Sequence, residues 1–279
     1  MMNKYLVLAN NYKDIDLALS KKTVEYIEKK GASACIVSDV INDYDGTNIK
    51  EEYIKDAKAV IVLGGDGTML RAAAGIGSHN VPLLGINLGT IGFLTEVEVS
   101  NLHEAIDRLL EGDYTLEERM MIDGEFEGKT YTSLNDVVIT RAGFSRIIGL
   151  NVYVNDELLD TYEADGVIVA TPTGSTGYNL SAGGPIVSPK SRAIVVTPIS
   201  PHSLTTKSIV FDSKDIIKIE IIKKRKTQET EAIVSFDGSN NSELSAGDMI
   251  TVKESGKKME LIKLYDLNFY RVLRDKIGG

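Results

Sequence analysis

Four apolar runs in the first hundred residues alternate with segments of helical character. The runs cover residues 5–9, 34–37, 59–63 and 81–87. After the first run, Asp14 or Asp16 can begin a helix that extends to about Lys30, where Gly31 ends it. Strands that are apolar throughout and alternate with helices are buried on both faces, as in parallel sheets. The pattern therefore predicts an α/β N-terminal domain with a parallel sheet.

From about residue 113 the pattern changes to alternation between apolar and polar residues. In the segment 217–221, for example, every second residue is isoleucine. Period-two alternation with frequent turns indicates antiparallel sheets. A length of 279 residues also favours two domains. We expect an α/β domain over residues 1–112 and a β-rich C-terminal domain over 113–262, with the segment 263–279 packing back on the first domain.

Composition and net charge restrict the cellular setting and the classes of molecule that the protein can bind. The single cysteine, Cys35, excludes an intramolecular disulfide and fits a reduced, cytoplasmic setting. The apolar stretch near the N-terminus is short, so we expect neither a signal peptide nor a segment that spans a bilayer. A net charge of −9 argues against a general binder of nucleic acid or membranes, and the basic run at 223–226 is interpreted as a solvated hairpin tip. We therefore expect a cytoplasmic protein that binds small molecules.

A glycine-rich loop, GGDGT, follows the third apolar run and precedes a segment rich in helix formers. Glycines let backbone N–H groups approach an anion, and a helix N-terminus adds the positive end of its dipole. The loop lacks the Walker A and G-x-G-x-x-G patterns, so its residues leave a phosphate site and a tight turn both open. As a phosphate-donor site, it would use the backbone of Gly64, Gly65, Gly67 and Thr68.

Three other segments place polar side chains beside glycines or at strand ends. INLGTIGFL, residues 86–94, follows the next strand, and loops at the carboxyl ends of parallel strands line one crevice. Asn135 and Asp136 offer an amide and a carboxylate, although this pair also favours turns. The segment 171–185 is dense in hydroxyl groups and longer than a hairpin needs, which is typical of a functional loop. The sequence lacks a hydrolase triad signature, HExxH and CxxC, which argues against a hydrolase or a zinc site.

Taken together, GGDGTML, NLGTIGFL, LNDVVITR, DGVIVATPTGSTGYNLSAGGPIV and PISPHSL resemble the NAD kinases, in that family's order, over about residues 60–240. Lipid kinases of the diacylglycerol and sphingosine type share GGDGT, so LND and the long hydroxyl-rich segment single out the NAD kinases. The resemblance implies a two-domain enzyme that forms homodimers or homotetramers, with its site between the domains. It would transfer a phosphoryl group from ATP, or from polyphosphate, to the 2′-hydroxyl of the adenosine ribose of NAD. Mg²⁺ or another divalent metal would assist, and NADP would be the product.

The resemblance also implies roles for individual residues. Asp66 matches the aspartate proposed as the general base, and it could instead, or in addition, bind the metal; no residue is assigned as a dedicated metal ligand. A lipid kinase and a non-catalytic dinucleotide-binding sensor remain the alternative functions. The implied NAD contacts are Asp66, Gly67, Arg71, Asn135, Asp136, Arg146, Asp165, Thr176, Gly177, Tyr178, Asn179, Leu180 and Ser181.

Overall fold

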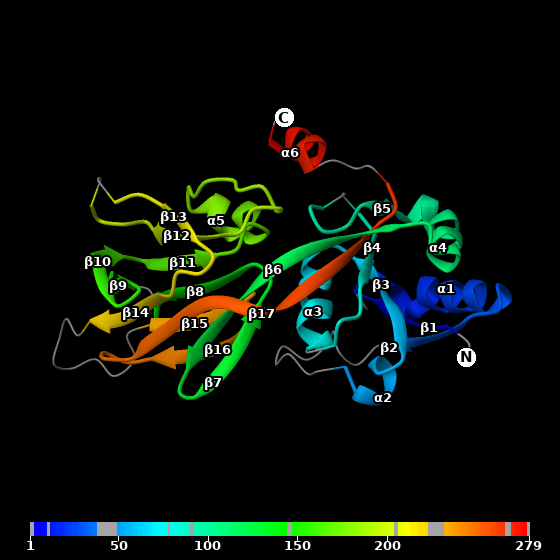
Figure 1. Ribbon diagram of the computed structural model, residues 1–279, viewed down its shortest axis with the longest axis horizontal. Helices are drawn as coiled ribbons and strands as arrows, with labels where there is room; N and C mark the ends of the chain where they lie inside the picture. Colours follow the sequence, from blue (N-terminus) through cyan, green and yellow to red (C-terminus); the bar gives the residue numbers. More distant parts are fainter. Residues whose placement is uncertain are drawn as a thin grey trace. The chain divides into compact units, whose positions relative to one another are not determined.

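The computed structural model describes residues 3–9, 12–37, 49–77, 79–89, 92–143, 147–203, 206–222, 232–265 and 269–277. The chain divides into two compact units. The first unit comprises Met1–Arg119 and Lys258–Gly279, and the second comprises Met120–Lys257. The first unit is therefore discontinuous in sequence, because the end of strand β17 (Met249–Lys263) and helix α6 (Phe269–Ile277) come after the second unit. Figure 1 labels the elements of both units.

A parallel sheet forms the centre of the first unit. Strand β1 (Lys4–Ala9) lies between β2 (Ser33–Val37) and β3 (Ala57–Gly64), and both pairings are parallel. Strand β3 pairs in parallel with β4 (Leu83–Asn87), which pairs in turn with β5 (Val97–Glu98). The apolar runs are thus the buried strands of a parallel sheet, and the predicted fold of the N-terminal domain is confirmed.

Helices cover both faces of this sheet. Helix α1 (Ala18–Lys29) and helix α4 (Leu102–Glu111) share a core cluster with alternate residues of β1. Helix α3 (Asp66–Ile76) lies on the other face, where a Cβ atom built on Gly85 would come 3.0 Å from the sulfur of Met69. The remaining helical elements of this unit are η1 (Ile15–Leu17), α2 (Glu51–Ile54), η2 (Val99–Asn101) and α6 (Phe269–Ile277).

Two antiparallel sheets form the second unit. The first contains six strands in the order β13-β12-β11-β8-β15-β16, and the second contains β10, β9, β14 and β17. The hairpin of β6 and β7 completes the unit. The strand bounds are β6 (Thr115–Phe126), β7 (Lys129–Ser133), β8 (Asp136–Arg141), β9 (Ile148–Val154), β10 (Glu157–Ala164), β11 (Gly166–Ala170), β12 (Ala193–Ile199), β13 (Ile209–Asp212), β14 (Ile217–Ile222), β15 (Ala232–Phe236), β16 (Ser239–Leu244) and β17 (Met249–Lys263).

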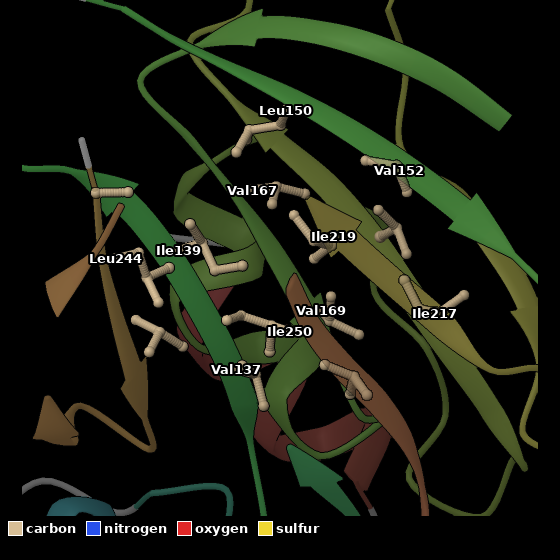
Figure 2. Packing of buried hydrophobic residues seen from close by; sticks show 14 of the residues in the cluster. Val137, Ile139, Leu150, Val152, Val167, Val169, Ile217, Ile219, Leu244 and Ile250 are labelled. Carbon is tan, nitrogen blue, oxygen red and sulfur yellow. The ribbon is translucent and has the colours of Figure 1, made fainter. Parts of the chain in front are cut away.

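The two sheets pack face to face around one apolar core. Figure 2 shows this core, with Ile139 and Val169 from the six-stranded sheet and Ile219 and Ile250 from the other sheet. Strand β14 alternates buried and half-buried residues, as its isoleucine pattern predicts. Burying alternate residues of each strand leaves the intervening polar residues on the outer face. The prediction of a β-rich C-terminal domain is confirmed.

The six-stranded sheet is buried on its second face as well. Val138, Ile168 and Val195 belong to a separate cluster there. Ala182 of the hydroxyl-rich segment and Val187, which follows that segment, pack against it. That burial explains why β11 and β12 are buried throughout and largely apolar although their neighbours are antiparallel. The segment carries η3 (Gly174–Thr176) and α5 (Tyr178–Ser181), and this packing fixes it over the sheet.

Turn chemistry sets the hairpins of the second unit. Asn155 and Asp156 both have positive φ, and they join β9 to β10 in the two-residue turn that this dipeptide favours. Glu127 and Gly128 also have positive φ and join β6 to β7, so the segment GEFEGKT forms a hairpin. The basic run at 223–226 lies outside the described residues.

Candidate active site

Asp66 links the two glycine-rich loops of the first unit. It is the first residue of α3, and its carboxylate accepts hydrogen bonds from the backbone N–H groups of Phe93 at 2.8 Å and Leu94 at 3.1 Å. A Cβ atom on Gly92 would lie 1.8 Å from Asp66 Oδ1, so this close approach requires glycine. The carboxylate is therefore turned toward the INLGTIGFL loop and away from the N–H groups of its own helix.

The glycines of GGDGT bring the backbone close to the start of α3. A Cβ atom on Gly64 would come 2.3 Å from the hydroxyl oxygen of Thr68, which is itself buried. The N–H group of Thr68 donates to the carbonyl of Gly65 at 2.9 Å, so it is already engaged. Because a helix leaves its first N–H groups without intrahelical partners, those of Asp66 and Gly67 are available to an anion. Four residues were predicted to contact the phosphate donor, and one of them, Thr68, thus contributes chiefly to packing.

Asp237 organises the Asn-Asp motif of the second unit. Its carboxylate accepts three hydrogen bonds from consecutive backbone N–H groups: Leu134 at 2.7 Å, Asn135 at 2.7 Å and Asp136 at 3.1 Å. The N–H of Asp237 donates in return to the carbonyl of Asp136 at 3.0 Å. Asp237 lies in the segment SFDGS and is not among the residues predicted from the sequence. Its Asp-Gly pair, in which both residues have positive φ, indicates a turn but not this role.

The side chains of Asn135 and Asp136 keep unused polar capacity in a buried place. Within the described part of the chain, the Oδ1 atom of Asn135 is buried without a hydrogen-bond partner. Burial, and then the charge of Asp237, raise the pKa of Asp136 to about 7. Burial also raises the pKa of Asp237 to about 6, although the three backbone N–H groups oppose this. Buried polar groups left unpaired are costly, and they point to a ligand that satisfies them.

The hydroxyl-rich segment begins beside this motif. Strand β11 pairs with β8, which sets Ala170 opposite Asp136. The Thr171 hydroxyl donates to the carbonyl of Leu134 at 2.6 Å, and a Cβ atom on Gly174 would lie 2.1 Å from the carbonyl oxygen of Asn135. The structure thus joins two motifs that lie more than thirty residues apart in the sequence.

Within the segment, the predicted NAD contacts differ in exposure. Tyr178 is 45% exposed, and Ser181 is also exposed. Thr176, Gly177 and Leu180 are half-buried.

Asn179, by contrast, is fully buried and engaged by the protein. Its amide donates to the carbonyls of Ser175 at 3.1 Å and Pro185 at 3.0 Å, and its Oδ1 accepts from the Thr197 hydroxyl at 2.6 Å. The Asn179 side chain therefore holds the segment in shape.

The other predicted residues lie at separate places. Arg71 is exposed on α3 in the first unit, together with Asp66 and Gly67. Asp165 lies in the second unit and forms an ion pair with Arg141, whose Nε atom is 2.7 Å from Asp165 Oδ1. Arg141 was not predicted. Arg146 lies outside the described residues.

Among the described residues, no group of three or more His, Cys, Asp or Glu side chains could hold a metal ion. Mg²⁺ needs no such group, because proteins usually bind it through one or two carboxylates together with substrate phosphates. Asp66 offers one such carboxylate beside the glycine-rich loops.

Comparisons with known proteins agree with both units. Residues 5–114 match the ATP-NAD kinase N-terminal domain, and residues 134–264 match the ATP-NAD kinase C-terminal domain. The NAD kinase of Lachnoclostridium phytofermentans is 44% identical over 284 residues, covering 99% of each chain. The NAD kinase of Agathobacter rectalis is 45% identical over 281 residues, covering 100% of this chain and 99% of the other.

Two solved structures have the same fold. Yeast NADH kinase complexed with NADH gives a TM-score of 0.89 at 21% identity, covering 99% of this chain and 88% of the other. An NAD kinase from Archaeoglobus fulgidus in complex with ATP gives 0.80 at 24% identity, covering 99% and 98%. The relatives support the NAD kinase interpretation over a lipid kinase or a non-catalytic sensor. On the match of both domains and of relatives over the full chain, the protein belongs to the ATP-NAD kinase family.

Proposed function

We propose that this protein transfers the terminal phosphoryl group of ATP to the 2′-hydroxyl of the adenosine ribose of NAD, giving NADP and ADP. The observation that carries the proposal is the carboxylate of Asp66, held by two backbone N–H groups beside a glycine-rich helix N-terminus. The family's curated relatives are NAD kinases, and the Archaeoglobus relative was solved with ATP. Both facts support ATP as donor and NAD as acceptor.

Asp66 serves as the general base in this proposal. Its carboxylate accepts the proton of the 2′-hydroxyl while the 2′-oxygen bonds to the terminal phosphorus of ATP. The bond from that phosphorus to the bridging oxygen breaks, and ADP leaves with the electron pair. General-base assistance is typically worth about 10² to 10⁴ in rate. The N–H groups of Phe93 and Leu94 contribute by fixing where the carboxylate points.

The first unit binds the donor. The free N–H groups at the start of α3, with the glycines of GGDGT, contact the phosphates as helix N-termini generally do. Asp66 and the donor phosphates would together hold Mg²⁺, which supplies neutralisation of phosphate charge when bound. Asp66 then has two candidate roles, as general base and as metal ligand. Measuring how the activity of an Asp66 variant depends on Mg²⁺ concentration distinguishes them.

The second unit binds the dinucleotide. The unpaired Oδ1 of Asn135 and the buried carboxyl of Asp136 are suited to the ribose and adenine region. Exposed Tyr178 and Ser181, with half-buried Thr176, supply further polar and aromatic surface. Asp165 serves the nicotinamide end, and its ion pair with Arg141 fixes its orientation.

The setting of the enzyme is also a proposal. We infer a homodimer or homotetramer in the cytoplasm, without nucleic acid or membrane partners, as the family resemblance and the single cysteine suggest. Among the described residues, every helix is too short or too polar to cross a membrane.

One assay tests the function directly. The purified protein is incubated with ATP, Mg²⁺ and NAD, and NADP is measured with an NADP-specific dehydrogenase. Parallel reactions replace ATP by polyphosphate, NAD by NADH, and NAD by diacylglycerol or sphingosine. NADP formation is the expected result. Phosphorylation of a lipid alone would favour the lipid kinase, and tight NAD binding without turnover would favour the sensor.

A further inference from the structure

Lys13 places a positive charge between the two glycine-rich loops of the first unit. Its ammonium nitrogen lies 3.9 Å from the position that a Cβ atom would take on Gly65 and 3.7 Å from that on Gly89. Gly65 belongs to GGDGT, and Gly89 belongs to INLGTIGFL. Lys13 itself follows β1, the strand adjacent to β3 in the same sheet. Three loops at the carboxyl ends of parallel strands therefore meet at this ammonium group.

The charge of Lys13 is not neutralised by the protein. Within the described ranges, Lys13 forms no ion pair with a carboxylate, and its side chain is exposed. The adjacent Asp14 is buried, and its carboxylate accepts from the N–H of Leu19 at 2.8 Å and the N–H of Ser20 at 2.9 Å. Asp14 is thus committed to the start of α1.

The segment that carries Lys13 is held firmly in place. Besides its two backbone contacts, Asp14 accepts a 2.6 Å hydrogen bond from the Ser20 hydroxyl. Asp16 and Leu17 both have positive φ, at 57° and 55°, a conformation that residues other than glycine adopt at a cost. A tight turn anchored by a buried carboxylate fixes the residue next to Lys13 relative to the start of α1. The Lys13 side chain therefore extends toward the two loops from an anchored turn.

We infer that Lys13 binds the phosphate chain of the donor. This inference rests on the proposed function, which places donor phosphates at GGDGT. An ammonium group is a compact point charge with three N–H donors, which suits the oxygens of a polyphosphate. It would complement the backbone N–H groups at the start of α3, which carry only partial charge. Lys13 is thus a donor-binding residue, distinct from the residues that contact NAD.

Inorganic tripolyphosphate is the probe that isolates this contact. It has neither base nor ribose, so its affinity reports phosphate contacts without a contribution from the nucleoside. Binding of tripolyphosphate and of ATP is measured by calorimetry, with Mg²⁺ present, for wild type, Lys13→Gln, Lys13→Arg and Lys22→Gln. Lys22 is the matched control, because it is an exposed lysine on α1. The Michaelis constants for ATP and NAD are determined on the same preparations.

Removing one partner of a charge-assisted hydrogen bond weakens the binding of a ligand by about 10- to 100-fold. We expect Lys13→Gln to weaken the binding of tripolyphosphate and of ATP by that factor. The Michaelis constant for ATP should rise, while that for NAD should stay unchanged. Lys13→Arg should keep most of the affinity, and Lys22→Gln should match wild type. Unchanged tripolyphosphate binding by Lys13→Gln would overturn the inference, as would an equal loss in Lys22→Gln or no tripolyphosphate binding by wild type. The calorimetry needs no turnover, so a wild-type protein that forms no NADP would contradict the proposed function separately.

Discussion

The carboxylate of Asp237 accepts a 2.7 Å hydrogen bond from the backbone N–H of Asn135, which lies 102 positions earlier in the chain. Two further N–H groups of the same loop, from Leu134 and Asp136, donate to that carboxylate. Three amides gathered on one anion hold the loop in a single conformation. Because Asn135 and Asp136 are among the proposed NAD contacts, Asp237 positions a binding loop that lies far from it in the sequence.

Replacing Asp237 with asparagine should therefore weaken NAD binding and stability together. One carboxylate oxygen becomes an NH₂ group that faces N–H donors, and a lost buried hydrogen bond of this kind costs about 1–3 kcal/mol. The Michaelis constant for NAD should rise while that for ATP stays near wild type. Asp248→Asn is the control, since Asp248 also accepts a backbone N–H, from Ser245 at 2.7 Å, but in an exposed turn. Equal behaviour of the two variants would refute the positioning role.

The buried pair of Asp136 and Asp237 should make stability depend on pH. Both carboxyl groups have pKa values raised from 3.8, to about 7 and about 6. Between the unfolded pKa values and the folded ones, the folded state binds more protons than the unfolded state. The stability that the two carboxyl groups contribute is therefore lost as pH rises through the folded pKa values. A difference of one in pKa corresponds to about 1.4 kcal/mol, so the two raised pKa values together correspond to roughly 7 kcal/mol.

The comparison of wild type with Asp136→Asn isolates this effect from the other titrating groups. The free energy of unfolding is measured by denaturant titration at intervals from pH 4 to pH 7. The asparagine variant removes the titrating group of Asp136, and with it the repulsion between the ionised carboxylates of Asp136 and Asp237. Its stability relative to wild type should rise steadily over this range. A difference between the two proteins that stays constant with pH would show that the pair does not titrate in this window.

Asp66→Asn tests the proposed base. Asparagine is nearly the same size, so the fold and NAD binding should be retained, while turnover falls by about 10²- to 10⁴-fold. The measurements are the turnover number, the Michaelis constant for NAD and the melting temperature. Asp56→Asn, an exposed aspartate just before β3, serves as control. Near-normal turnover in Asp66→Asn would remove the base role, and activity restored by excess Mg²⁺ would assign Asp66 to the metal.

The sequence predicted most of the fold because its signals are local. Apolar runs, alternation and turn dipeptides such as Asn155-Asp156 each determine a strand or a hairpin within a few residues. The site depends instead on contacts between distant segments. The pairing of β8 with β11 brings Asn135 beside Thr171, and nothing local encodes the role of Asp237 or the reach of Lys13 toward Gly89. The motifs were therefore recognisable, while the residues that position them were not.

Gly92 offers the sharpest test of how Asp66 is positioned. A Cβ atom at this position would lie 1.8 Å from Oδ1 and 2.4 Å from Cγ of Asp66. The carboxylate is the mobile end of a side chain, so in Gly92→Ala it should rotate away and leave the backbone folded. That movement would break its hydrogen bonds to Phe93 and Leu94 and misplace the proposed base. A misplacement of about 1 Å can cost on the order of 10²-fold in rate.

The expected result is a large fall in the turnover number of Gly92→Ala, with the Michaelis constant for NAD and the melting temperature close to wild type. Gly256→Ala is the matched control, because a Cβ atom there meets nothing within 4 Å. A Gly92→Ala enzyme with wild-type turnover would mean that the geometry of Asp66 is not critical for the reaction. A fall in melting temperature as large as the fall in activity would instead place Gly92 among residues needed for folding. Loss of turnover in a stable Gly92→Ala protein that still binds NAD would show that catalysis depends on the position of the Asp66 carboxylate.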